Sequence, residues 1–392
     1  MKISIKKYLL YSSVFAIFTE AFFFNFIIDW KLLYLIVILN YFLLMSIKKL
    51  KFNVYFLALI GFFFIHGIIS NTVVGVPYNF MIAQIIGVSI LGTYYYNFIP
   101  LYKPDEIIKV YTKMCLYVGV IGYLFYFLNI NLNDGRLQSI FKEPAHYVIV
   151  VIPACFYFLK EKKYIAFAVL FGTLILSNSS LGYIGCALMF IVPNISWKRL
   201  SYLAATIPVV LCVLYYVYQE YPFFKMRVEE TYESMNVINT GKFDEYTNLS
   251  SYALISNLNV AKHNFQDHPL GTGIGSHVHM HTTRYLKNIR PPEYIKIQNK
   301  QEINASDANS LFTRIVSELG IFGLLMVVVL LYFAVKVFSF KELTIAQGIF
   351  IYILLKLFRD GHYFPPELFF FIWLLYYSYK EVLSNREEML VQ

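Results

Sequence analysis

The feature that most limits the fold of this chain is a series of apolar runs, each about 15 to 24 residues long with almost no charge inside. Lipid offers no hydrogen-bond partners to the backbone, so each run is expected to cross the membrane as a helix. Hydrophobic residues make up 58% of the chain and charged residues only 15%. The predicted fold class is therefore an all-α, polytopic membrane protein.

About twelve transmembrane helices are predicted. The seventh and eighth are separated at residues 177–180, because four small polar residues would be costly in hydrocarbon. The whole chain, 1–392, is expected to form a single integral membrane domain, with one large polar loop, 219–306, between spans nine and ten. The predicted spans lie near residues 8–29, 32–47, 53–71, 79–98, 107–130, 146–160, 164–177, 180–195, 200–218, 308–336, 343–358 and 366–380.

Lysine and arginine in the short connections indicate the orientation. Most of them fall on one side if the N-terminus is cytoplasmic, which predicts that both termini face the cytoplasm and that the large loop faces outward. The net charge of +9 is then mostly a consequence of topology, and no nucleic-acid partner is expected. The four cysteines fall inside predicted spans and are expected to be packing residues.

The large loop holds five of the eight histidines. One long polar loop outside the membrane is more typical of an enzyme that acts on a membrane-anchored substrate than of a carrier. Three of them, His277, His279 and His281, alternate as ligands on a strand would, but no cysteine or acidic partner stands at a ligand spacing. Asp-x-Asp pairs for a magnesium-bridged diphosphate are also missing from the outer side. Neither a metal nor a cofactor is therefore predicted, and arginines and helix N-termini would supply the positive charge.

Within the loop, residues 224–233 are expected to form at most an amphipathic surface helix. Residues 251–265 have a helical spacing of apolar side chains that would pack on the membrane domain. Residues 268–277 contain a proline and three glycines, so the chain must turn sharply there. The returning helix is expected to have Ser306 or Asp307 as its N-cap.

The outer connection before the sixth span is the first candidate site. Glu143-Pro144 places a proline at the first helical position, and the N-terminus of such a helix attracts phosphate. Arg136 could fold back as a second anion ligand, while Glu143 and His146 are candidate proton acceptors. The alternative is that Arg136 and Glu143 form a salt bridge and that His146 is a membrane-interface residue.

Two further clusters carry charge near the predicted outer surface. Arg314 shares a helix face with Ser310, Ser317 and Glu318, either as a functional group or as half of an Arg314–Glu318 ion pair on water-exposed turns. Between the last two spans, Asp360 could orient His362 or neutralise Arg359.

Four short segments in order resemble the bacterial O-antigen and capsular polysaccharide polymerases, the Wzy proteins, and more distantly the O-antigen ligases of the same membrane superfamily. The resemblance covers about residues 135–323. The segments are Arg136 with Phe141–Pro144, Ser177–Gly182, His268–Gly275, and Asn309–Ser310 with Ser317–Gly323. In the ligase branch a histidine commonly precedes the polar residue that opens the returning helix, whereas here the sequence is Asp307-Ala308-Asn309-Ser310, which favours a polymerase.

The resemblance implies a glycosyltransferase of the bacterial cytoplasmic (inner) membrane, working in lipopolysaccharide O-antigen or capsule biosynthesis. It would join oligosaccharide repeat units carried on undecaprenyl diphosphate, without a metal. Membrane lipid, a chain-length regulator and a flippase of the same pathway are the implied partners. We then expect Arg136 to be the principal diphosphate ligand and the second ligand to be Arg314, Arg359 or Arg284. Glu143 or His146 would be the base, and His362 is the next candidate for that role.

The sequence is less consistent with three other classes of protein. An O-antigen ligase would use the same donor but a lipid A core acceptor. A flippase or other transporter would be expected to show internal repeats and a polar lumen. A scaffold would have no reason to gather arginine and histidine on one face.

Overall fold

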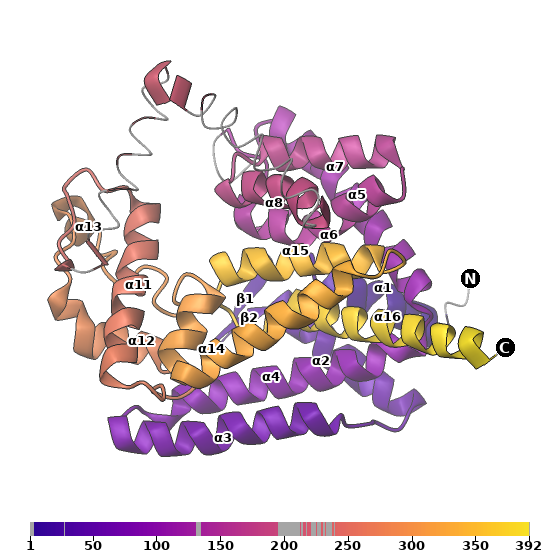
Figure 1. Cartoon of the computed structure of the whole chain (residues 1–392), viewed down its shortest axis with the longest axis horizontal. Coiled ribbons are helices and arrows are strands. Elements are labelled where there is room, and N and C mark those ends of the chain that lie inside the picture. The colour runs from indigo at the N-terminus through magenta and orange to yellow at the C-terminus, as the bar shows by residue number, and fades with distance from the viewer. Residues whose placement is uncertain are drawn as a thin grey trace.

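The computed structural model describes residues 4–26, 28–130, 135–194 and 240–391, with isolated residues between 212 and 238. Most helices form a bundle along the long axis of the molecule, and a smaller group with α11 to α13 lies at one end of it (Figure 1). The bundle contains α1 (Ile5–Ala16), α2 (Leu32–Ile47), α3 (Val54–Val74), α4 (Tyr78–Phe98), α5 (Pro104–Phe127), α6 (Pro144–Lys160), α7 (Tyr164–Leu176), α8 (Ser180–Ile191), α14 (Leu311–Phe338), α15 (Thr344–Phe358) and α16 (Pro366–Val391). The end group contains α11 (Leu249–Asp267), α12 (His277–Met280) and α13 (Glu293–Ile297).

The first predicted span, 8–29, is wrong in its second half. Helix α1 ends at Ala16, and the chain then forms an antiparallel hairpin of β1 (Phe23–Phe26) and β2 (Ile28–Lys31), in which Phe24 pairs with Trp30. Three of the four residues in β1 are phenylalanine and β2 contains Ile28 and Trp30; such aromatic and β-branched residues favour extended backbone, which the apolar run alone did not reveal. Apart from this hairpin the described residues are helical or irregular, as the predicted all-α class requires.

Two predicted helix boundaries are confirmed. Helix α7 ends at Leu176 and α8 begins at Ser180, with Asn178 between them in the left-handed conformation at φ 46°. Helix α6 begins at Pro144, with Glu143 as its N-cap.

Among the described helices, four are long and apolar enough to cross a membrane by length and composition: α3, α4 with the turn that follows it, α5 and α14. Five shorter apolar helices accompany them, α2, α6, α7, α8 and α15. The total of about twelve spans stays a prediction. Most of the predicted ninth span, 200–218, and of the segment 224–233 lies outside the described residues.

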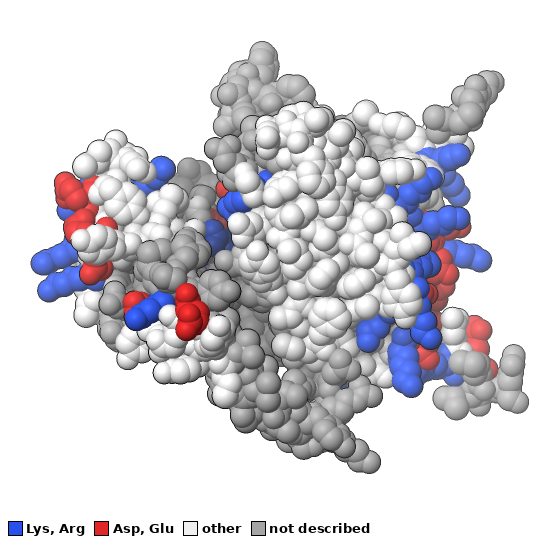
Figure 2. Space-filling view, turned by 90° about the horizontal axis from the view of Figure 1, so that it is seen from above, with Lys and Arg blue, Asp and Glu red and all other residues white. Residues whose placement is uncertain are grey.

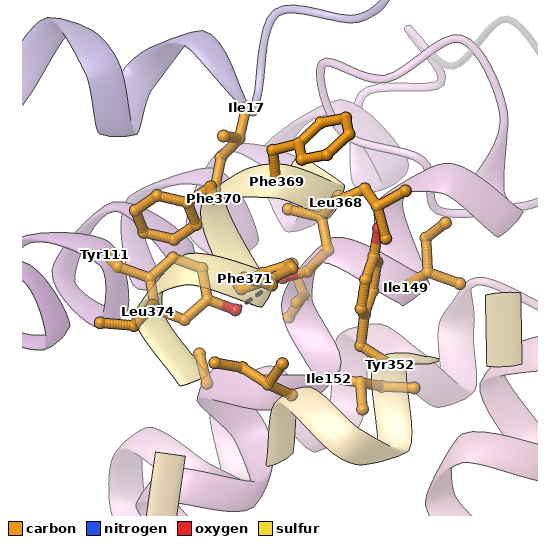
Figure 3. Packing of buried hydrophobic residues seen from close by; sticks show 14 of the residues in the cluster. Ile17, Tyr111, Ile149, Ile152, Tyr352, Leu368, Phe369, Phe370, Phe371 and Leu374 are labelled. Carbon is orange, nitrogen blue, oxygen red and sulfur yellow. Dashed lines mark hydrogen bonds between the residues drawn. The ribbon is translucent and has the colours of Figure 1, made fainter. Parts of the chain in front are cut away.

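The core of the bundle is built where α15 packs on α6. Gly348 of α15 lies so close to Pro153 that an added Cβ would approach the Pro153 carbonyl oxygen to 2.8 Å. Pro153 has no N–H to donate, and the Tyr111 hydroxyl donates to the Val150 carbonyl in the preceding turn, at 2.7 Å. Phe370 and Phe371 of α16 pack beside Tyr111 in the same cluster (Figure 3). This packing fixes the ends of α6, α15 and α16 relative to one another.

Charged residues are unevenly distributed along the long axis. Figure 2 shows lysine and arginine gathered at the end where both termini lie, an uncharged band across the middle, and both signs of charge on the opposite end group. The predicted grouping of basic residues with the two termini is therefore visible in the structure. Which side of the membrane this end faces stays a prediction.

Candidate functional site

Five segments that are distant in sequence enclose a polar cavity of about 180 Å³. They are the hairpin region, the N-terminus of α6, the start of α8, the turn that precedes α14, and the connection between α15 and α16. Charged side chains dominate its lining: Glu20, Lys31, Lys142, Glu143, His146, Asp307, Arg359, Asp360 and His362.

Four of the residues predicted from the sequence line this cavity together. Glu143 and His146 come from the first residues around the start of α6, and Arg359 and His362 from the connection before α16. Glu143 is exposed and Arg359 is partly buried, and within the described residues neither side chain has a hydrogen bond or an ion pair. Both are therefore available to a ligand, although their catalytic or binding roles stay predictions.

The hairpin supplies residues that the sequence did not single out. Glu20 Oε2 lies 3.3 Å from His146 Nδ1, and Lys31 Nζ lies 3.8 Å from Glu20 Oε1. Burial alone would raise the pKa of Glu20, but the contact with His146 and the charge of Lys31 lower it below its usual value. Glu20 thus stays ionised beside His146. The backbone N–H of Lys142 donates to Glu20 Oε2 at 3.4 Å, and its exposed ammonium, which has no contact among the described side chains, adds a further cation.

Asp360 does not neutralise Arg359, but its Oδ1 accepts the backbone N–H of His362 at 3.2 Å and so helps to position that residue. Asp360 Oδ2 binds the ammonium of Lys356 at 2.6 Å, and Lys356 is fully buried in α15 rather than extended toward the surface. Burial would raise the pKa of Asp360, but the charge of Lys356 lowers it well below the usual range. Arg359 is consequently left without a carboxylate partner in this part of the chain.

Asp307, Asp360 and His362 are the residues that could hold a metal. Their candidate ligand atoms lie within 4.8 Å of one another, and His362 Nε2 is 3.9 Å from Asp307 Oδ2. A divalent cation would have to compete with Lys356, which already neutralises Asp360. Backbone N–H groups of Asn309 and Gly361 also already bind Asp307. The donor set therefore fits a resident metal poorly.

Two predicted phosphate ligands lie away from the cavity. The Arg136 Nε donates to the Ser177 carbonyl at 3.3 Å, where it caps the end of α7, and the alternative salt bridge with Glu143 is not present among the described contacts. Arg284 on the end group donates to His268 Nε2 at 2.9 Å and to Asp267 Oδ2 at 3.5 Å. Neither guanidinium lines the cavity.

Arg314 is a buried structural residue in this arrangement. Its Nε donates to Glu318 Oε1 at 3.1 Å, its Nη1 donates to the Gly361 carbonyl at 3.0 Å, and its guanidinium lies 4.3 Å from the Tyr363 ring centroid. The ion pair expected on water-exposed turns is thus present but buried, with Arg314 2% and Glu318 0% exposed. It anchors the connection that carries Arg359 and His362.

The glycine-rich turn 268–277 packs against Glu318, the partner of Arg314. The backbone N–H groups of Gly275 and His277 donate to the Glu318 carboxylate at 2.7 and 3.2 Å, and that of Gly273 donates to the Glu318 carbonyl at 2.9 Å. Gly273 and Gly275 have φ of 96° and 85°, which side-chain-bearing residues rarely adopt. The turn predicted from the sequence is confirmed, and it is docked on α14.

The returning helix begins later than predicted. Ser310, not Ser306 or Asp307, is the N-cap of α14, and its hydroxyl accepts from the Thr313 N–H at 3.0 Å. Ala308 and Asn309 stand in the left-handed region at φ 55° and 59°, which prevents an earlier helix start. The turn before the helix therefore projects Asp307 into the cavity.

One of the loop histidines, His277, holds the end group on α14. His277 Nδ1 lies 2.8 Å from Ser317 Oγ and its Nε2 lies 3.0 Å from Asn257 Oδ1, all three fully buried. Both ring nitrogens are thus engaged by α14 and α11. The face of α11 that packs on α14 includes these polar residues as well as the apolar ones that predicted it.

This docking is expected to weaken in acid. Burial, with His281 and Arg314 nearby, holds the pKa of His277 well below its usual value, and burial lowers the pKa of His281 to about 4. An unfolded chain protonates these rings below pH ~6.5. Their contribution is therefore complete above that pH and is lost as the pH falls toward the folded values, by up to ~1.4 kcal/mol per pH unit for each ring.

Hydrogen exchange measures this effect. Amides of α11 and of the turn 268–277 should lose protection between pH 7.5 and 5.0 after correction for intrinsic rates. His277→Gln should remove much of the difference, whereas His279→Gln, whose ring contacts Phe80, should leave it unchanged. Equal protection at both pH values in the wild type would contradict the assignment.

One protein-family model matches the middle of this chain. The family model described as O-antigen ligase matches residues 165–328, which span α7, α8, the end group and the first part of α14. This match supports membership of the O-antigen ligase and polymerase superfamily, whose members are glycosyltransferase-like enzymes. No significant match among curated proteins was found. The cavity lies where the matched region meets the flanking segments, since Leu181 and Asn304 to Asn309 line it together with residues on either side.

Proposed function

We propose that the chain is a polysaccharide polymerase that joins lipid-linked oligosaccharide repeat units on the outer face of the bacterial cytoplasmic membrane. The observation that carries this proposal is the single cavity in which Lys31, Lys142 and Arg359 converge beside the N-terminus of α6. Cations and a helix N-terminus are the groups that hold a diphosphate. The family match points to the same chemistry.

The transfer requires little from the protein beyond charge and position. A hydroxyl oxygen of one repeat unit forms a bond to the anomeric carbon of the growing chain, and the bond from that carbon to the diphosphate oxygen breaks. The electron pair leaves with the undecaprenyl diphosphate, whose charge Arg359 and Lys142 would stabilise. The hydroxyl proton passes to a base that contacts the attacking sugar.

An O-antigen ligase is the alternative, because the matching family model carries that description. A ligase would transfer the chain to a lipid A core instead of to another repeat unit. The polymerase is favoured by the residues before Ser310, where Asp307, Ala308 and Asn309 stand and the ligase-type histidine does not. Within the pathway, a flippase and a chain-length regulator are the partners we propose.

The phenotype of a deletion strain separates the possibilities. Loss of a polymerase should leave single repeat units capped on the lipid A core or anchor, with no long chains on an electrophoretic gel of surface polysaccharide. Loss of a ligase should leave long chains on undecaprenyl diphosphate. If the deletion left no repeat unit outside the membrane, the protein would instead act in transport and the proposal would be wrong.

A further inference from the structure

A second cavity, of about 220 Å³, adjoins the polar one. The two share five lining residues, Glu20, Lys31, His146, Asp360 and His362. The rest of their lining differs. Cationic and amide side chains line the first cavity, whereas aromatic and aliphatic side chains line most of the second. A ligand that reaches from one to the other would thus need a highly charged part and a less polar part.

One carboxyl group stands in the apolar part of the second cavity. Glu367 lies in the first turn of α16 and is only 7% exposed. The dipole of the helix favours a negative charge at this position. Tyr34 and Phe364 line the same space, with ring centroids 6.2 Å apart. Mostly apolar walls with a few placed polar groups are typical of a pocket for a small organic ligand.

Glu367 differs from the other acids of the two cavities that are buried or partly buried. Glu20 contacts His146 and Lys31, Asp360 binds Lys356, and Asp307 accepts two backbone N–H groups. For Glu367, no hydrogen bond or ion pair to another residue is found in the described part of the chain. A carboxyl group buried without such a partner is costly, and groups of this kind gather at functional sites.

We propose that the second cavity receives the sugar bearing the attacking hydroxyl, and that Glu367 accepts the proton of that hydroxyl. This inference rests on the proposed glycosyl transfer. The diphosphate of the donor lies among the cations of the first cavity, and the new bond forms at the shared wall lined by His146 and His362. The hydroxyl oxygen binds the anomeric carbon, its proton goes to a Glu367 oxygen, and the diphosphate leaves with the bonding electrons.

The test uses the full-length protein in proteoliposomes with undecaprenyl-diphosphate-linked repeat units extracted from the deletion strain. Glu367→Gln should lower the rate of chain extension by about 10²–10⁴-fold, as expected for loss of a proton acceptor. Retention of radiolabelled lipid-linked unit should change less than twofold, because the diphosphate site is intact. The wild-type rate should rise with pH as the proton acceptor ionises, and this rise should disappear in the variant.

Two further variants guard against a purely structural effect. Glu367→Asp keeps a carboxylate and should recover part of the rate and the pH dependence, while Glu381→Gln, an exposed residue on the same helix, should extend chains at the wild-type rate. The assignment of the base would be overturned if Glu367→Gln extended chains normally. It would also be overturned if Glu143→Gln lost extension while Glu367→Gln kept it. A wild-type protein that binds the units but never extends them would overturn the proposed function itself.

Discussion

Arg359→Ala is expected to reduce chain extension by about 10²–10³-fold, the usual effect of removing one group that stabilises developing charge. Arg359 lines the polar cavity, and Lys356 rather than Arg359 neutralises the adjacent Asp360. Its guanidinium is therefore free to bind the departing diphosphate. The measurement is extension of lipid-linked repeat units in proteoliposomes, with the length of surface polysaccharide in the complemented deletion strain as a second readout.

Three variants sharpen this prediction. Arg359→Lys keeps the charge but loses two-pronged binding, and should retain an intermediate rate. Arg284→Ala, whose side chain pairs with Asp267 and His268 on the end group, should extend chains normally. Arg136→Ala tests the ligand favoured by the sequence against the one favoured by the structure. Full activity of Arg359→Ala together with inactivity of Arg136→Ala would reverse our ranking of the two arginines.

Local signals in the sequence were sufficient for most helix boundaries. Pro144 and the polar residues 177–180 fix the start of α6 and the break between α7 and α8 through backbone chemistry that depends only on near neighbours. The hairpin after α1 was missed because aromatic apolar residues suit both a membrane helix and a strand, and hydropathy does not separate the two.

The residues that line the cavity could be predicted only in part, because local features reveal some of them and long-range contacts bring in the others. Glu143, His146, Arg359 and His362 were recognised from helix ends and short polar connections, which are local features. The contact between Glu20 and His146 joins residues that are 126 positions apart in the sequence. No periodicity encodes such a pairing, which depends on how α1 and the hairpin dock on α6. For the same reason the sequence ranked Arg136 above Arg359, whereas the fold places only Arg359 in the cavity.

Replacing Glu318 is expected to have the largest effect on stability. Glu318→Ala would leave the fully buried Arg314 without its counter-ion and would remove the acceptor of the Gly275 and His277 N–H groups. Breaking a buried pair by removing one partner costs about 3–5 kcal/mol. The docking of the turn 268–277 and the connection at Gly361 should loosen together, because Arg314 and Glu318 join both to α14.

Thermal unfolding in detergent, followed by intrinsic fluorescence, measures this loss, with Glu293→Ala as an exposed control on the end group. The double variant Arg314→Met, Glu318→Met removes both charges while conserving volume, and should be more stable than Glu318→Ala alone. The unpaired N–H groups of the glycine-rich turn would still keep it below the wild type. If Glu318→Ala unfolded at the wild-type temperature, the buried pair could not be what holds the end group on α14. The position of Arg359 would then have to depend on the packing of α15 against α6 alone.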